Sequence, residues 1–65
     1  MNFDIIDSKR RQLRYTITEF CERIGIDRKT YYNMQSNPDS IKIGMLNKMA
    51  DLLELSKTER KQLLP

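Results

Sequence analysis

The stretch TITEFCERIGIDRKTYYNMQS, residues 16–36, contains the pattern that decides the fold. Thr16 stands just before apolar residues that recur at helical spacing, and Glu19 follows three positions later. This spacing is the signature of a capping box, in which the threonine side chain accepts a hydrogen bond from a backbone N–H and the glutamate reaches back to the cap. The pattern therefore predicts a helix over residues 17–24 with one buried face.

A tight turn and a second short helix are expected next. Gly25 stands where a helix can end in a left-handed residue without steric cost, and Asp27 can cap a helix over about residues 28–35. Cys21 and Gly25 are small residues four positions apart, as two closely crossing helices require. The second helix should expose Arg28, Lys29, Tyr32 and Asn33, and should turn Thr30, Tyr31 and Met34 partly inward.

These residues resemble the helix-turn-helix of the lambda repressor/Cro family. That family has a small residue at the fifth motif position, glycine at the ninth and an aliphatic residue at the fifteenth, where this chain has Cys21, Gly25 and the bulkier Tyr31. Ile17 stands where the family often has a glutamine that touches phosphate, and Gln35 replaces a common glutamate. The resemblance covers nearly the whole chain once the flanking helices are included, with the motif at about residues 17–36.

A helix with a strongly basic side is expected before the motif, over residues 3–14. Its apolar residues Phe3, Ile6 and Leu13 fall roughly on one face. The basic residues occupy much of the opposite side, and they are Lys9, Arg10, Arg11 and Arg14. This basic run is either a solvated helix face or, beside a helix-turn-helix, a group of charges near the DNA backbone.

Two further helices are expected after the motif. The loop SNPDS comes first, because a proline disfavours continuing a helix. An amphipathic helix over about residues 42–54 follows, and Ser56 and Glu59 form a second capping box that opens a fifth helix running to Leu64. The apolar face of the fourth helix comprises Ile43, Leu46, Met49, Ala50 and Leu53. We therefore expect an all-α fold, a compact five-helix bundle of lambda-repressor-like DNA-binding type, in one domain over residues 1–65.

Composition excludes several classes of function. The 65 residues carry a net charge of +3 and contain no histidine and a single cysteine, so the sequence offers no zinc site and no Cys–His pair. Gly25 and Gly44 lie too far apart to build a glycine-rich phosphate loop. No apolar run is long enough to span a membrane, and the N-terminus lacks the order of a signal peptide. We expect no enzyme activity, no cofactor, no metal and no membrane partner, and we expect the protein in the cytoplasm.

The resemblance implies that the helix starting near Arg28 lies in the major groove of double-stranded operator DNA. The family's base-contacting positions fall on Arg28, Lys29 and Asn33. Arginine and lysine can pair with guanine O6 and N7, and asparagine can pair with adenine N6 and N7. Tyr32 is a further candidate for base contact, and its alternative is to pack against the loop over residues 37–42.

Phosphate contacts are expected from the start of the first motif helix and from the segments around it. Helix N-termini favour anions because their first amides are unpaired and the helix dipole points that way. Ile17 can contribute only its backbone N–H, since its side chain has no donor. The expected phosphate contacts are Thr16, Ile17, Thr18, Thr30, Lys42, Arg10 and Arg14.

A homodimer, at least on DNA, is also implied by the resemblance, because family members usually bind near-palindromic sites as two-fold dimers. Leu63 and Leu64 have too few neighbours in their short helix to form a core alone. They either fold back on the preceding helices or meet a second copy, and they are the expected dimer interface. Since these residues leave no room for an effector domain, the sequence resembles a small phage or prophage Cro-like regulator without a small-molecule effector, unless it is the excised N-terminal domain of a longer repressor.

Two other functions remain open. A protein-binding module that kept the fold and lost DNA binding would explain four residues as a surface adapted to a partner, namely Ile17, Tyr31, Tyr32 and Gln35. An RNA-binding protein would need exposed aromatic residues for stacking, and only the Tyr31–Tyr32 pair suggests this. DNA binding instead predicts that Lys42 and the basic run share one face with the second motif helix, uninterrupted by acidic residues.

Overall fold

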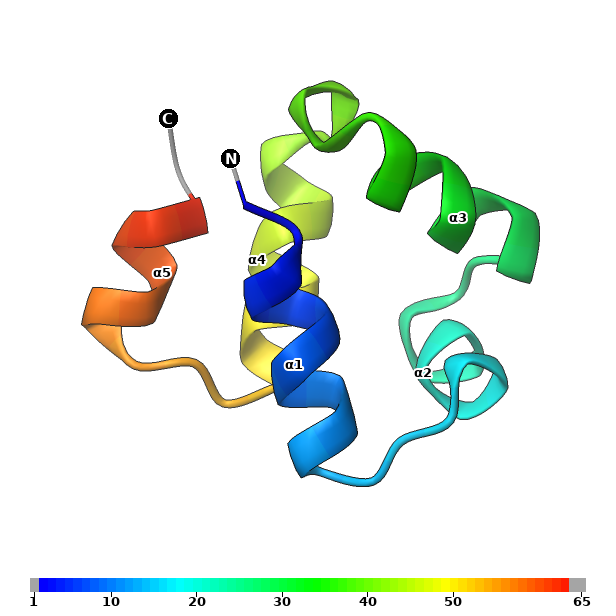
Figure 1. The fold of residues 1–65 in the computed structure, drawn as a ribbon, viewed down its shortest axis with the longest axis horizontal. Coiled ribbons are helices and arrows are strands. Elements are labelled where there is room, and N and C mark those ends of the chain that lie inside the picture. The colour runs from blue at the N-terminus through cyan, green and yellow to red at the C-terminus, as the bar shows by residue number, and fades with distance from the viewer. Residues whose placement is uncertain (1, 64–65) are drawn as a thin grey trace.

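A computed structural model describes residues 2–63, and within them all regular structure is helical. The elements are α1 (Asp4–Gln12), α2 (Ile17–Ile24), α3 (Arg28–Ser36), the short 3-10 helix η1 (Pro38–Ser40), α4 (Ile43–Leu52) and α5 (Lys57–Leu63). In Figure 1, α2 and α3 lie on one side of α1 and α5 lies on the other. This arrangement confirms the expected all-α bundle, with η1 as an addition inside the predicted loop.

The starts of α2, α3 and α5 follow the capping residues found in the sequence. Asp27 Oδ1 accepts a hydrogen bond of 2.8 Å from the Thr30 backbone N–H at the start of α3. At α5 the capping box is complete: Glu59 N–H donates to Ser56 Oγ at 3.2 Å, and Ser56 N–H donates to Glu59 Oε1 at 2.9 Å. Each of these bonds satisfies a backbone donor that the helix itself leaves unpaired.

Three helices end in a residue with positive φ. Gly25 follows α2 with φ +79°, as predicted, while Arg14 after α1 has φ +62° and Glu54 after α4 has φ +54°. In each case the next residue donates its N–H back into the last turn: Tyr15 to Arg10, Ile26 to Cys21 and Leu55 to Ala50, at 3.0–3.1 Å. This is the Schellman motif. It ends α1 at Gln12 and α4 at Leu52, two residues before the ends of the expected ranges 3–14 and 42–54.

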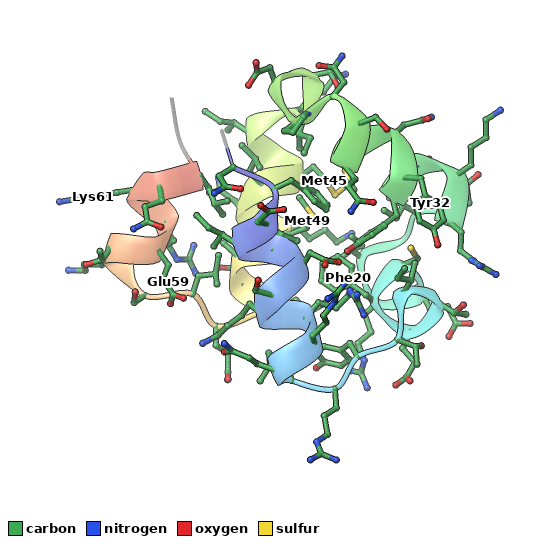
Figure 2. The ribbon with its side chains drawn as sticks, viewed as in Figure 1. Phe20, Tyr32, Met45, Met49, Glu59 and Lys61 are labelled. Atoms are coloured by element: carbon green, nitrogen blue, oxygen red, sulfur yellow. The ribbon has the colours of Figure 1, made fainter. Side chains whose placement is uncertain are left out.

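The core lies between the helices and is centred on aromatic rings. The Tyr31 ring is fully buried and meets the rings of Phe3 and Phe20 edge-on, with centroids 5.4 and 5.8 Å apart. Figure 2 shows Phe20 and Met49 pointing into the middle of the bundle. The other buried apolar residues are Ile6, Cys21, Ile24, Met34, Leu46, Ala50, Leu53, Leu55 and Leu63.

Three packing expectations are wrong. Leu13 is 38% exposed because α1 ends before it, and Ile43 is 61% exposed because it occupies the first position of α4, outside the core. Gly25 is not required by a close helix crossing either, since a Cβ there would meet only Lys48 Nζ, at 3.7 Å. Its glycine serves the left-handed φ alone.

Leu63 folds back into the bundle rather than facing outward. It is 1% exposed and belongs to the hydrophobic core. The prediction that Leu63 forms a dimer interface is therefore wrong, because a side chain buried inside its own chain cannot contact a second copy. Leu64, the other residue of that prediction, lies outside the described residues. Among those residues no helix is long and apolar enough to cross a membrane.

Candidate functional site

The outward side of α3 carries a group of polar side chains. The buried residues of this helix are Tyr31 and Met34, so the remaining positions face outward. Thr30 is among them, although the sequence predicted that it turns partly inward; its position beside the cap holds it at the surface, where its side-chain and backbone hydrogen bonds lower the pKa of Asp27. The exposed residues are Arg28, Lys29, Thr30, Tyr32, Asn33, Gln35 and Ser36.

The predicted base-contacting residues are available to a ligand. Arg28, Lys29 and Asn33 are exposed, and their side chains form no hydrogen bond with the rest of the described chain. Tyr32 is 44% exposed, and its ring meets the Tyr31 ring edge-on at 5.9 Å. Figure 2 shows Tyr32 at the side of the molecule away from α5. Planar or forked donors on one exposed helix suit hydrogen bonding to base edges.

A hollow of about 270 Å³ beside α3 brings three of the predicted contacts together. Thr30 and Asn33 line it from α3, and Lys42 lines it from the start of α4. Lys42 is the N-cap residue of α4 and makes no side-chain cap, and the first turn of α4 has no acidic residue. An uncapped helix start beside a lysine favours an anion. The remaining lining residues are Met34, Ser40, Ile41 and Met45.

The start of α2 departs from its predicted form. Thr16 Oγ1 accepts from the Glu19 backbone N–H at 3.1 Å, as expected, but the Glu19 carboxylate accepts from the Thr16 hydroxyl at 3.1 Å rather than from the Thr16 backbone. The hydroxyl is thus occupied on both sides, and a negative charge lies beside the helix start. Thr18 is exposed and Ile17 is half-buried. The groups at this helix start that remain available to an anion are the Thr18 side chain and the backbone N–H groups of Ile17 and Thr18.

The basic run on α1 does not form one solvated face. Arg10 is buried at 7% exposure, so its guanidinium cannot reach a phosphate at the surface. The prediction that Arg10 contacts phosphate is therefore wrong. Arg11 is exposed and pairs with Asp7 Oδ2 at 3.0 Å. Arg14 lies in the turn between α1 and α2, and its side chain is exposed.

Arg10 joins three segments from inside the bundle. Its Nε donates to the Tyr31 hydroxyl at 3.2 Å, and its two terminal nitrogens donate to the Tyr15 carbonyl at 2.6 Å and to Asp7 Oδ1 at 3.0 Å. The Tyr31 hydroxyl donates to the same Asp7 oxygen at 2.7 Å. We call Asp7, Arg10 and Tyr31, with the carbonyl of Tyr15, the Arg10 network.

The environment of this network shifts the pKa values of all three side chains. Burial acts to lower the pKa of Arg10, but its hydrogen bonds to Asp7 and Tyr31 raise it overall. Burial acts to raise the pKa of Asp7, but hydrogen bonds from Tyr31 and Arg10, with the charges of Arg10 and Arg11, lower it overall. Burial, followed by the hydrogen bond to Asp7, raises the pKa of Tyr31 to about 12. Asp7 is therefore held as a carboxylate and Tyr31 as a neutral donor, which is the pairing that their hydrogen bond needs.

Sequence reasoning missed this network. The one local signal is Asp7 three positions before Arg10, a spacing that places opposite charges together on a helix. Tyr31 is 21 positions beyond Arg10, and no periodicity connects them. Within residues 2–63 no group of His, Cys, Asp or Glu residues is suited to hold a metal ion.

A family model described as helix-turn-helix matches residues 6–60, which run from α1 into α5 and include all of α2 and α3. No curated protein and no solved structure matches the chain.

Proposed function

Because this chain belongs to the helix-turn-helix family of lambda repressor/Cro type, a family of DNA-binding regulators, we propose that it is a Cro-like repressor of a specific operator. In this proposal α3 lies in the major groove of double-stranded DNA. The observation that carries it is the exposed side of α3, where Arg28, Lys29 and Asn33 have free donors above a buried Tyr31.

The proposed base contacts divide by chemistry. Arg28, at the first position of α3, pairs with guanine O6 and N7, and Lys29 reaches a neighbouring guanine. Asn33 offers one donor and one acceptor to adenine N6 and N7. The exposed ring edge of Tyr32 contacts a thymine methyl or its hydroxyl reaches a phosphate. Each well-formed pair discriminates against a wrong base by about 1–3 kcal/mol.

The proposed phosphate contacts surround this helix. Lys42 and the amides at the start of α4 take one phosphate across the hollow beside α3, together with Thr30. Thr18 and the free amides of Ile17 and Thr18 take another at the start of α2. Thr16 contributes only if its hydroxyl turns away from Glu19. Arg14 reaches the backbone from the preceding turn. Such contacts set the register of the protein on DNA and do not read sequence.

A homodimer on DNA completes the proposal. One module of this size buries too little surface to select a site alone, and two-fold dimers place their α3 helices in half-sites one helical turn, about 34 Å, apart. The dimer surface does not include Leu63, which belongs to the core of its own chain.

Duplex binding across a salt series tests this function. Arg28→Ala should reduce the preference for the best site and weaken binding to it, because a bidentate base contact is lost. Lys42→Ala should weaken binding to every duplex alike and reduce the salt slope by about 1, because one counterion fewer is released. Lys61→Ala is the matched control, since Lys61 is an exposed lysine of α5 that Figure 2 shows on the opposite side from Tyr32.

The outcome that would contradict the proposal is an absence of binding by the wild-type protein at about 50 mM salt and high micromolar concentration. Non-specific affinities of DNA-binding proteins are about 10⁻⁴–10⁻⁶ M even at physiological salt, so failure under these conditions would exclude DNA as the ligand. The exposed face of α3 would then have to bind a protein instead.

A further inference from the structure

A buried charged residue in a small bundle needs an explanation, and Arg10 is the one that the described chain contains. Each of its three guanidinium nitrogens donates a hydrogen bond within the Arg10 network, and no buried side-chain nitrogen or oxygen of residues 2–63 lacks a hydrogen bond. Arg10, Asp7 and Tyr31 close a ring of three hydrogen bonds, at 3.2, 2.7 and 3.0 Å. The ring joins α1 directly to α3.

Stability alone does not account for this ring. Desolvation of a buried ion pair offsets most of its attraction, and well-packed apolar residues often serve equally well. A phenylalanine at position 31 would fill the same space between Phe3 and Phe20 with no polar atom to satisfy. The Tyr31 hydroxyl adds an interaction that depends on orientation. Hydrogen bonds weaken steeply with misalignment, whereas apolar contact is non-directional.

Direction matters here because of where Tyr31 lies in α3. Successive residues of a helix are rotated by about 100° about its axis, since one turn takes 3.6 residues. Tyr31 faces inward at zero exposure while Tyr32 and Asn33, the next two residues, face outward. Fixing the Tyr31 hydroxyl on α1 therefore fixes how far α3 is turned about its own axis. Binding groups need placement within about 0.5 Å, so a small rotation of α3 would misdirect Asn33.

We propose that Tyr31, through its hydroxyl on Asp7 and Arg10, is a positioning residue that sets the rotation of α3 and thereby the sequence preference of the protein. This inference rests on the DNA-binding function proposed above. Tyr31 itself touches no base. It acts through the exposed residues of the same helix.

Tyr31→Phe tests the inference because it removes the hydroxyl and keeps the ring. The probes are the duplex that the wild-type protein enriches most from a random-sequence pool and a scrambled duplex of the same length and composition. We expect the ratio of the two affinities to fall by about tenfold, the cost of roughly one wrong base pair. Affinity for the scrambled duplex and the salt slope should stay as in the wild type. All binding is measured where circular dichroism shows each variant fully folded.

Tyr15→Phe is the matched control. It removes the hydroxyl of a half-buried tyrosine that makes no side-chain hydrogen bond and leaves the Tyr15 carbonyl in the network. Its affinity ratio should equal that of the wild type. Should Tyr31→Phe fail to fold, Asp7→Asn replaces it: an oxygen acceptor remains but the charge is lost, and the ratio should fall by about threefold.

The outcomes distinguish a failure of the positioning role of Tyr31 from a failure of the proposed DNA-binding function. A wild-type protein that enriches no duplex would overturn both. A wild-type protein that enriches a duplex, with folded Tyr31→Phe or Asp7→Asn keeping the full affinity ratio, would overturn the inference and leave the function standing. A fall in both affinities by the same factor would also overturn it, because a merely structural loss affects every duplex alike.

Discussion

At the scale of single residues, the two glycines of this chain have opposite roles. Gly25 adopts φ +79° at the end of α2, a conformation that costs other residues about 1–2 kcal/mol. Gly44 lies at the second position of α4 in open space, with nothing within 4 Å of where a Cβ would stand. The backbone requires the first glycine, whereas the second only weakens its helix.

Alanine substitutions should therefore change stability in opposite directions. Gly25→Ala should lower the free energy of unfolding by about 1 kcal/mol, because relief of unfolded-state entropy offsets only part of the strain. Gly44→Ala should raise it by about 0.5 kcal/mol, since the position lies in the first turn of the helix. Urea unfolding monitored by circular dichroism gives both values. A loss of stability in Gly44→Ala would show that its φ and ψ or its surroundings exclude a side chain.

At the scale of elements, α1 and α3 are held together by the hydrogen bonds of the Tyr31 hydroxyl with Arg10 and Asp7 as well as by packing. The folded state lowers the pKa of Asp7 from its ordinary 3.8 and raises that of Tyr31 from 10.0 to about 12. For Asp7 the folded state binds its proton less tightly than the unfolded state, so its contribution to stability is lost as pH falls through and below 3.8. For Tyr31 the folded state binds its proton more tightly, so stability is lost as pH rises from 10.0 towards about 12.

Each of the two residues should account for a different part of the pH dependence of the unfolding free energy, Tyr31 for the alkaline part and Asp7 for the acid part. Tyr31→Phe should remove the part of the alkaline loss that the wild type shows above pH 10.0, because no hydroxyl remains to titrate. Asp7→Asn should flatten the acid limb below pH 3.8 for the same reason. Urea midpoints measured at each pH for the three proteins provide the comparison. An alkaline limb of equal slope in Tyr31→Phe and wild type would mean that Tyr31 does not titrate in this window.

At the scale of the whole molecule, α5 completes the core. Leu63 is 1% exposed, and Arg60 secures the same helix through bonds of 3.2 Å to the Leu55 carbonyl and 2.8 Å to Asp51 Oδ1. A chain of about 60 residues buries only about 60% of the surface that its unfolded form exposes. Each buried leucine is consequently a large share of the total stability.

Leu63→Ala should lower the free energy of unfolding by about 2–5 kcal/mol, the usual effect of truncating a buried leucine. Leu63→Met, which keeps the volume, should lower it by less than about 1.5 kcal/mol. Neither change should weaken association of folded chains, which sedimentation equilibrium on selected duplex DNA measures. A stable Leu63→Ala protein that dissociates more readily would return Leu63 to the dimer surface.

The sequence by itself determined the five α-helices, the starts of α2, α3 and α5, and most of the exposed residues of α3. These features depend on interactions within a few residues: Asp27 with Thr30, Ser56 with Glu59, and the left-handed conformation at Gly25. Local bonds of this kind have a fixed spacing, so they can be recognised without knowing how the helices pack. The resemblance of the chain to the family was confirmed over residues 6–60.

Only the tertiary structure decided which side chains are buried at helix ends and which charged side chains form hydrogen bonds inside the bundle. Periodicity grouped Leu13 and Ile43 with the core, yet the first lies past the end of α1 and the second at the exposed start of α4. The pattern of basic residues from Lys9 to Arg14 did not show which of them are exposed. Arg10 is buried against Tyr31, whereas Arg14 is exposed. The physical reason is that the bond between Arg10 and Tyr31 depends on how α3 packs against α1, and residues 21 positions apart share no periodicity in the sequence.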